Sequence, residues 1–146
     1  MRKIDYLIIH CSATRADRDY PVVQLLGDHL RRGFRGIGYH YYVQKDGTVH
    51  CTRPLEQPGA HCLGHNRHSI GICYEGGLDK NGRPCDTRTP EQRSALRLLV
   101  YQLLKDFHNA RVCGHRDLST DRDGDGIVEP EEWTKHCPCF DVASEL

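Results

Sequence analysis

The chain lacks a long run of apolar residues. Its N-terminal apolar segment, Leu7–Ile9, follows only two cations and is far shorter than the core of a secretory leader. No other run approaches the roughly 20 apolar residues that cross a membrane. We therefore expect synthesis in the cytoplasm without a signal peptide, and no membrane partner.

The chain also lacks an excess of charge of either sign. Lys and Arg number 20, Asp and Glu number 20, and the formal net charge is zero. Nucleic-acid binding depends on neutralising phosphates with cations, so this balance removes the electrostatic argument for a nucleic-acid partner, and we infer none. Internal repeats and Pro- or Ser-rich linkers are missing as well. We expect one monomeric domain over residues 1–146.

Cysteine, by contrast, is plentiful, with eight residues in 146. An even number in a small secreted protein would indicate disulfides, but thiols stay reduced in the cytoplasm. Most of them, such as Cys51, Cys62, Cys73 and Cys85, are therefore expected to be small apolar or surface residues rather than ligands.

The pattern of apolar residues alternates between strands and helices. Strands are expected over 4–10, 39–44, 48–52, 69–74 and 111–113. Helical spacing covers 21–32 and 90–108, and Thr89, Pro90 and Gln92 form a capping box before the second helix. This order predicts an α/β fold with a single mixed central sheet flanked by helices.

Three residues far apart in the chain have the chemistry of a zinc site. His10 ends the first strand, His115 follows the last one, and Cys137 lies in the tail. Two imidazoles and a thiolate leave one coordination position open for water, as in catalytic zinc sites, whereas a fourth protein ligand would make the site structural. Cys139 is the residue that would close it.

Six short segments in order resemble the zinc-dependent N-acetylmuramoyl-L-alanine amidases of the type 2 family, which include T7-lysozyme-like phage amidases and animal peptidoglycan recognition proteins. The resemblance extends from about Ile4 to Val142. It rests on 10–14 (HCSAT), 38–41 (GYHY), 45–49 (KDGTV), 66–71 (NRHSIG), 114–117 (GHRD) and 135–141 (KHCPCFD).

The resemblance implies a role for each matching position. His10, His115 and Cys137 would bind zinc, Tyr39 and Lys135 would act in catalysis, and His61 would lie in the substrate groove. It also implies a T7-lysozyme-like α/β domain that hydrolyses the amide bond between N-acetylmuramic acid and L-alanine in peptidoglycan.

The residues themselves fit amide hydrolysis. Zn²⁺ activates water, and a fixed cation stabilises the oxyanion that develops on the carbonyl. In an extended tail, Lys135 and Cys137 would point to the same face. Cys139 would share that face too, but the spacing of Cys137 from Lys135 matches the family pattern and favours Cys137 as the ligand. Cys11 is expected on the face opposite His10.

An acidic insertion, residues 121–132, matches the twelve-residue calcium loop. Acidic side chains stand at its first, third, fifth and twelfth positions, which are Asp121, Asp123, Asp125 and Glu132, with Gly126 at the sixth. Weak Ca²⁺ binding is one hypothesis, and an acidic surface loop is the alternative. The flanking residues lack the two helices of an EF-hand.

The amidase could act in either of two biological settings, and one alternative function is open. A lytic enzyme without a signal peptide would reach the cell wall only after release, whereas a recycling enzyme would meet muropeptides in the cytoplasm. The alternative is a non-catalytic peptidoglycan-binding module. Such modules typically lack the cysteine ligand, so Cys137 favours the enzyme.

Overall fold

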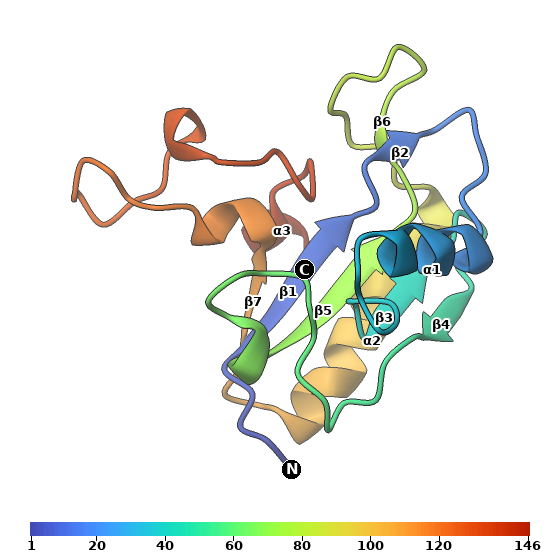
Figure 1. Cartoon of the computed structure of the whole chain (residues 1–146). Coiled ribbons are helices and arrows are strands. Elements are labelled where there is room, and N and C mark those ends of the chain that lie inside the picture. Colours follow the sequence, from blue (N-terminus) through green and yellow to red (C-terminus); the bar gives the residue numbers. More distant parts are fainter.

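A five-stranded mixed sheet forms the centre of the protein in the computed structural model, which describes residues 1–146 (Figure 1). The strand order is β4-β3-β5-β1-β7, and every neighbouring pair is parallel except β3 and β4. Their bounds are Tyr6–Cys11 (β1), Tyr41–Val43 (β3), Val49–Cys51 (β4), Ser69–Tyr74 (β5) and Arg111–Gly114 (β7). The predicted α/β class with a single mixed central sheet is confirmed.

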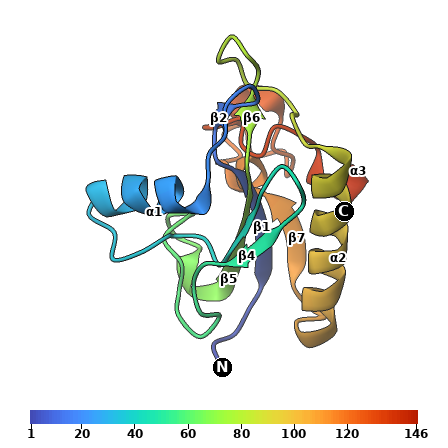
Figure 2. The same ribbon diagram turned by 90° about the vertical axis from the view of Figure 1, so that its right-hand side faces the viewer.

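Helices cover both faces of this sheet (Figure 2). The helix α1 (Val22–Arg31) lies on one face, and α2 (Pro90–Asp106) and the short C-terminal α3 (Val142–Glu145) lie on the other. Single 3₁₀ turns occur at Asn66–His68, His115–Leu118 and Pro130–Glu132. No helix is both long enough and apolar enough to cross a membrane.

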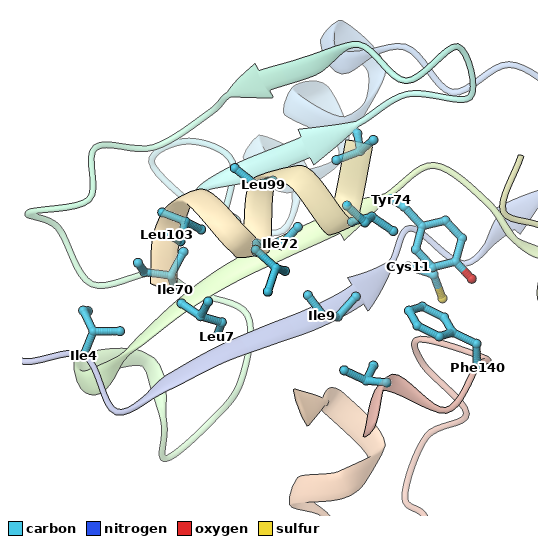
Figure 3. Close-up of a cluster of buried hydrophobic side chains, with 14 residues drawn as sticks. Ile4, Leu7, Ile9, Cys11, Ile70, Ile72, Tyr74, Leu99, Leu103 and Phe140 are labelled. Carbon is cyan, nitrogen blue, oxygen red and sulfur yellow. The ribbon is translucent and has the colours of Figure 1, made fainter. Parts of the chain in front are cut away.

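The main core lies between the sheet and α2 (Figure 3). The predicted capping box starts α2, because the Thr89 hydroxyl accepts from the Gln92 backbone N–H and the Gln92 side chain accepts from the Thr89 N–H. From there Leu96, Leu99 and Leu103 repeat at helical spacing and pack on the strands. This apolar layer fixes the position of the sheet edge that carries the site.

Alternation along β1 determines which side chains face that site. Leu7, Ile9 and Cys11 point to the core under α2, so Ile8 and His10 point to the other face. The predicted opposite orientation of Cys11 and His10 is confirmed. His10 ends up at the carboxyl end of a parallel strand, where α/β folds build their clefts.

Several elements differ from the sequence prediction at their ends. The hairpin strands are shorter than expected, because only Tyr41–Val43 and Val49–Cys51 keep the ladder around the Asp46-Gly47 turn. The segment after β1, where the sequence predicts no strand, contains β2 (Thr14–Arg15), which pairs with β6 (Gly77–Leu78) in a small second sheet. The stretch before β5, where the sequence predicts neither strand nor helix, contains the first 3₁₀ turn.

The C-terminal tail is fixed against the sheet although it forms no strand. The Tyr74 hydroxyl donates to the Pro138 carbonyl at 2.6 Å, and the Arg116 N–H donates to the Cys137 carbonyl at 2.9 Å. A Cβ on Gly114 would stand 2.7 Å from Pro138 Cδ, so glycine is required there for the tail to approach β7. The tail thereby brings Cys137 next to His115.

Candidate active site

One cleft of about 770 Å³ opens at the carboxyl ends of β1 and β7. Its lining includes every residue to which the sequence assigned a zinc, catalytic or substrate role: His10, Tyr39, His61, His115, Lys135 and Cys137. These residues come from β1, the segment before β3, the loop before β5, the 3₁₀ turn after β7 and the tail. Five separate segments therefore build one site, which supports the grouping made from the sequence.

The three ligand atoms of the expected zinc site converge in this cleft. The donor atoms of His10, His115 and Cys137 all lie within 4.8 Å of one another, and His10 Nδ1 is 3.8 Å from Cys137 Sγ. Around a tetrahedral Zn²⁺, such donors would stand about 3.5 Å apart. The separation, the donor chemistry and the open side of the cleft all fit a zinc ion with three protein ligands.

Backbone contacts support the thiolate position. The Cys11 N–H donates to Cys137 Sγ at 3.2 Å, so the sulfur that would carry negative charge accepts a hydrogen bond from the end of β1. The Arg116 N–H binds the Cys137 carbonyl, which links the third ligand to the segment of the second. The site thus depends on tail-to-sheet contacts as much as on the ligands.

His61 contacts His10 on the side away from the ligand group. Its Nδ1 lies 2.8 Å from His10 Nε2, and its Nε2 lies 3.4 Å from the Ser69 hydroxyl. Burial, followed by the neighbouring His40 and His115, lowers the pKa of His61 to about 3, so its ring stays neutral. A neutral His61 can accept at Nδ1 while His10 Nε2–H donates, which leaves His10 Nδ1 free to bind a metal.

Neighbouring residues hold His61 in this position. The Asn66 side-chain oxygen accepts from the backbone N–H groups of His61 and Cys62, at 2.9 and 3.0 Å. The ring lies directly over Gly71, where an added Cβ would come within 2.6 Å of it. Gly71 on β5 is therefore the residue that gives the imidazole room to reach His10.

Tyr39 closes the cleft beside His10. Its ring centroid is 5.0 Å from that of His10 and 5.5 Å from that of His29. Burial, with the nearby thiols of Cys73, Cys137 and Cys11, raises the pKa of Tyr39 above its ordinary value. The phenol therefore keeps its proton at neutral pH.

The lining of the cleft is positively charged although the whole chain is neutral. It contains Arg32 and Lys135 but no Asp or Glu. Arg32 is exposed at the end of α1, with its guanidinium 4.9 Å from the centre of the Phe34 ring. An anionic group on a bound molecule would be attracted by both cations.

The prediction that Cys139 lies on the same face as Cys137 is wrong. Its φ of +69° turns the chain out of the extended conformation, so side chains do not alternate past Cys137. Cys139 Sγ lies near the Gly77 carbonyl and 4.0 Å from Cys11 Sγ, outside the ligand group of His10, His115 and Cys137. His136 is exposed and outside the cleft lining.

Sequence reasoning missed several residues that shape the cleft. His29 is buried, and its Nδ1 accepts from the Gly38 N–H at 2.9 Å, which fixes the chain just before Tyr39. His40 has no role assigned from the sequence, yet its Nδ1 accepts from the Gly71 N–H and its Nε2 donates to the Gln57 carbonyl. The i, i+4 spacing of Leu25 and His29 on one helical face was the signal for a buried imidazole.

The acidic insertion brings its carboxylates together as the spacing predicts. Oxygens of Asp121, Asp123 and Glu132 lie within 4.8 Å of one another, and those of Asp123, Asp125 and Glu129 form a second such group. Asp121 accepts from the backbone N–H groups of Gly124 and Gly126, which closes the loop. These groups are common in acidic loops without an ion, so calcium binding stays a prediction.

The fold and the cleft together define an α/β domain with a cleft whose His-His-Cys group could hold a metal ion. Residues 1–138 match the family described as N-acetylmuramoyl-L-alanine amidase, and the chain belongs to this family. The resemblance seen in the sequence is confirmed, and so is the activity it implies. The protein hydrolyses the amide bond between N-acetylmuramic acid and L-alanine in peptidoglycan.

Known relatives agree with this assignment. The chain is 32% identical to the endolysin of Escherichia phage T7 over 138 residues, which cover 94% of this chain and 82% of the endolysin. The amidase LysC of Clostridium intestinale URNW has the same fold, with a TM-score of 0.74, 24% identity and coverage of 99% of this chain and 82% of that one. Bumblebee PGRP-SA also has this fold, with a TM-score of 0.74, 19% identity and coverage of 99% and 80%.

Proposed function

We propose that the amidase is zinc-dependent and that His10, His115 and Cys137 hold the ion. The observation that carries this proposal is the convergence of their three donor atoms within 4.8 Å, in a cleft that also contains Lys135 and Tyr39. Bound Zn²⁺ would lower the pKa of a coordinated water to about 7 and polarise the scissile carbonyl.

Lys135 and Tyr39 have complementary parts in this proposal. The Lys135 ammonium enters the cleft from the tail, two residues before Cys137, and would stabilise the oxyanion that develops on the substrate carbonyl. The Tyr39 phenol, which keeps its proton, would donate a hydrogen bond to the reacting oxygen and deliver a proton toward the leaving amine.

The two cations that line the cleft would orient the substrate by attracting its charged peptide stem. The peptide stem released by the reaction carries free carboxylates, whereas the sugar on the other side of the bond is largely uncharged. We infer that Arg32 attracts a stem carboxylate, because no acidic residue lines the cleft and none pairs with this guanidinium. His61 would contact the substrate side of the cleft and also orient His10.

The wider setting is part of the same proposal. Residues 1–146 would act as one monomeric amidase domain, with an insertion at 121–132 that binds Ca²⁺ weakly. The enzyme would act on the cell wall after release from the cytoplasm, as an endolysin does, and the T7 relative carries that name. Turnover of muropeptides within the cell is the second setting.

Digestion of purified peptidoglycan tests the proposal. Zinc-loaded protein is expected to release stem peptides with new N-terminal L-alanine. The activity should disappear with a chelator and return with Zn²⁺. Cys137→Ala should remove both activity and bound zinc, whereas the exposed Cys51→Ser should keep both.

Two results would contradict the proposal. Activity that persists in metal-free protein would exclude the zinc mechanism. Binding of peptidoglycan without any cleavage would indicate the alternative, a recognition module rather than a zinc enzyme.

A further inference from the structure

Two thiols meet on the core side of the cleft wall. Cys11, the last residue of β1, and Cys139, in the tail, place their sulfur atoms 4.0 Å apart. Cys11 is 5% exposed, and Cys139 is half-buried. The mechanism uses neither residue, and together they form what we call the Cys11–Cys139 pair.

The pair joins the same two segments as the proposed metal site, but from the other side. Cys11 follows the ligand His10, and Cys139 lies two residues after the ligand Cys137. Alternation along β1 turns Cys11 toward the core below α2, and the positive φ of Cys139 turns its side chain the same way. A covalent bond between these sulfurs would therefore hold the two ligand-bearing segments together without entering the cleft.

We propose that Cys11 and Cys139 form a disulfide when the protein reaches the cell envelope. This compartment follows from the proposed function, since the cell wall lies outside the cytoplasm. Thiols are stable in the cytoplasm, but the bacterial envelope is oxidising. The same chain would thus be made with free thiols and would act with the pair oxidised.

A disulfide of low molecular weight is a sufficient oxidant for this step. The more accessible Cys139 thiolate attacks one sulfur of oxidised glutathione, forms a mixed disulfide and releases one glutathione thiolate. The Cys11 thiolate then attacks Cys139 Sγ, forms the Cys11–Cys139 bond and releases the second glutathione. Two protein thiols lose two protons and two electrons, and one glutathione disulfide becomes two thiols.

Other cysteines are less suited to this bond. Cys137 Sγ lies 3.8 Å from His10 Nδ1 and accepts from the Cys11 N–H, so it is engaged in the proposed ligand group. Cys51 and Cys85 are exposed, and their thiols form no sulfur–sulfur contact. The geometry favours the Cys11–Cys139 pair because its sulfurs are already adjacent.

The bond would close a loop that contains most of the chain. Such long loops remove much freedom from the unfolded state, and the tail would no longer detach from β1 on its own. We expect the melting temperature to rise by about 5–10 °C. We also expect Zn²⁺ to leave several-fold more slowly, because Cys137 would stay beside His10 during fluctuations of the tail.

The experiment compares reduced and oxidised forms of the zinc-loaded protein. The protein is incubated overnight with oxidised glutathione, the remaining thiols are alkylated, and peptide mapping identifies the cross-link. Melting temperature and the rate of Zn²⁺ transfer to a chelator are then measured for both forms. Peptide mapping and melting temperature depend on neither zinc nor hydrolysis, so a failure of the proposed zinc-dependent function would leave these two measurements interpretable.

Matched variants make the result specific. Cys139→Ser should abolish the cross-link and both gains, and Cys11→Ala should do the same. Cys85→Ser should keep them, because Cys85 is exposed and its backbone N–H pairs with the Gly77 carbonyl. The proposal is overturned if Cys11 and Cys139 remain alkylated as free thiols. It is also overturned if the cross-link joins Cys137 or Cys85, or if the bond forms without slowing zinc release.

Discussion

Lys135 is the cation that the proposed mechanism uses most directly. Its removal by Lys135→Met should reduce kcat by about 10²-fold, because an oxyanion then develops without its fixed positive charge. Zinc content should not change, since Lys135 is not a ligand. Steady-state hydrolysis of muropeptides and metal analysis check both points, with the exposed Lys80→Met as a control. An unchanged kcat would remove Lys135 from the mechanism.

His61 has two proposed roles that can be separated by measurement. Its Nδ1 accepts from His10, so His61→Leu should weaken zinc binding by about 10–100-fold, as loss of a ligand's orienting partner does. His61→Asn keeps an acceptor near this position and should restore part of the affinity. Competition with a chelator dye gives the zinc affinity. A raised KM with unchanged zinc affinity would instead support a role in substrate binding alone.

At the scale of elements, Arg88 determines how firmly the tail is held. Its side chain is 1% exposed, binds Asp86 at 2.9 Å and Glu145 at 2.6 Å, and lies 3.4 Å over the Phe140 ring. Arg88→Met leaves those two carboxylates without their buried partner and should reduce the free energy of unfolding by roughly 2–3 kcal/mol. Denaturant titration measures this loss.

Arg93 provides the matched control for Arg88. It pairs with the same two carboxylates, but its side chain is 38% exposed. Arg93→Met should therefore cost less than about 1 kcal/mol. If the two variants lost equal stability, burial of the Arg88 guanidinium would not be what holds the tail.

The acidic insertion can be tested as an element of its own. Hydrogen bonding to Glu132 and then to Asp125 raises the pKa of Glu129 to about 8, so this carboxyl keeps a proton near neutrality. A bound cation would displace that proton. Calorimetric titration with Ca²⁺ should thus show proton release, and affinity should fall as the pH drops below 8.

Substitution shows whether the carboxylates are responsible. The double variant Asp121→Ala with Asp125→Ala should lose the calorimetric signal, and Asp79→Ala, in another exposed turn, should retain it. Absence of heat in the unmodified protein would leave the insertion as an acidic surface loop.

At the scale of the whole molecule, buried neutral histidines predict acid sensitivity. Burial lowers the pKa of His40 to about 4, against an ordinary value near 6.5. Above pH 6.5 the imidazole is neutral in both states and its contribution to stability is complete. Between pH 6.5 and about 4 the His40 imidazole binds a proton in the unfolded chain but not in the folded protein, so the free energy of unfolding falls.

Denaturation midpoints of metal-free protein between pH 7.5 and 4.5 measure this dependence. They should decrease with falling pH, and His40→Gln should make the slope shallower even if it lowers stability throughout. The exposed His108→Gln should leave the slope unchanged. Equal midpoints at pH 7 and pH 5 would contradict the assignment.

The sequence by itself determined the local elements and the residue types of the site. Alternation along β1 placed His10 and Cys11 on opposite faces, and the Thr89 capping box started α2, because both features depend on neighbouring residues. The short motifs with imidazole, thiol, phenol and ammonium groups indicated the family and its reaction.

Only the tertiary structure decided what those side chains contact. The hydrogen bond between His10 and His61 depends on the space that Gly71 leaves for the His61 ring. The turn at Cys139 depends on how the tail packs on β7 and β1. The contacts of His10 with His61 and of Cys11 with Cys139 join residues more than 50 positions apart, so neither spacing nor periodicity encodes them locally. The sequence therefore determined the chemistry that was present, and packing decided that Cys137 faces the cleft while Cys139 meets Cys11.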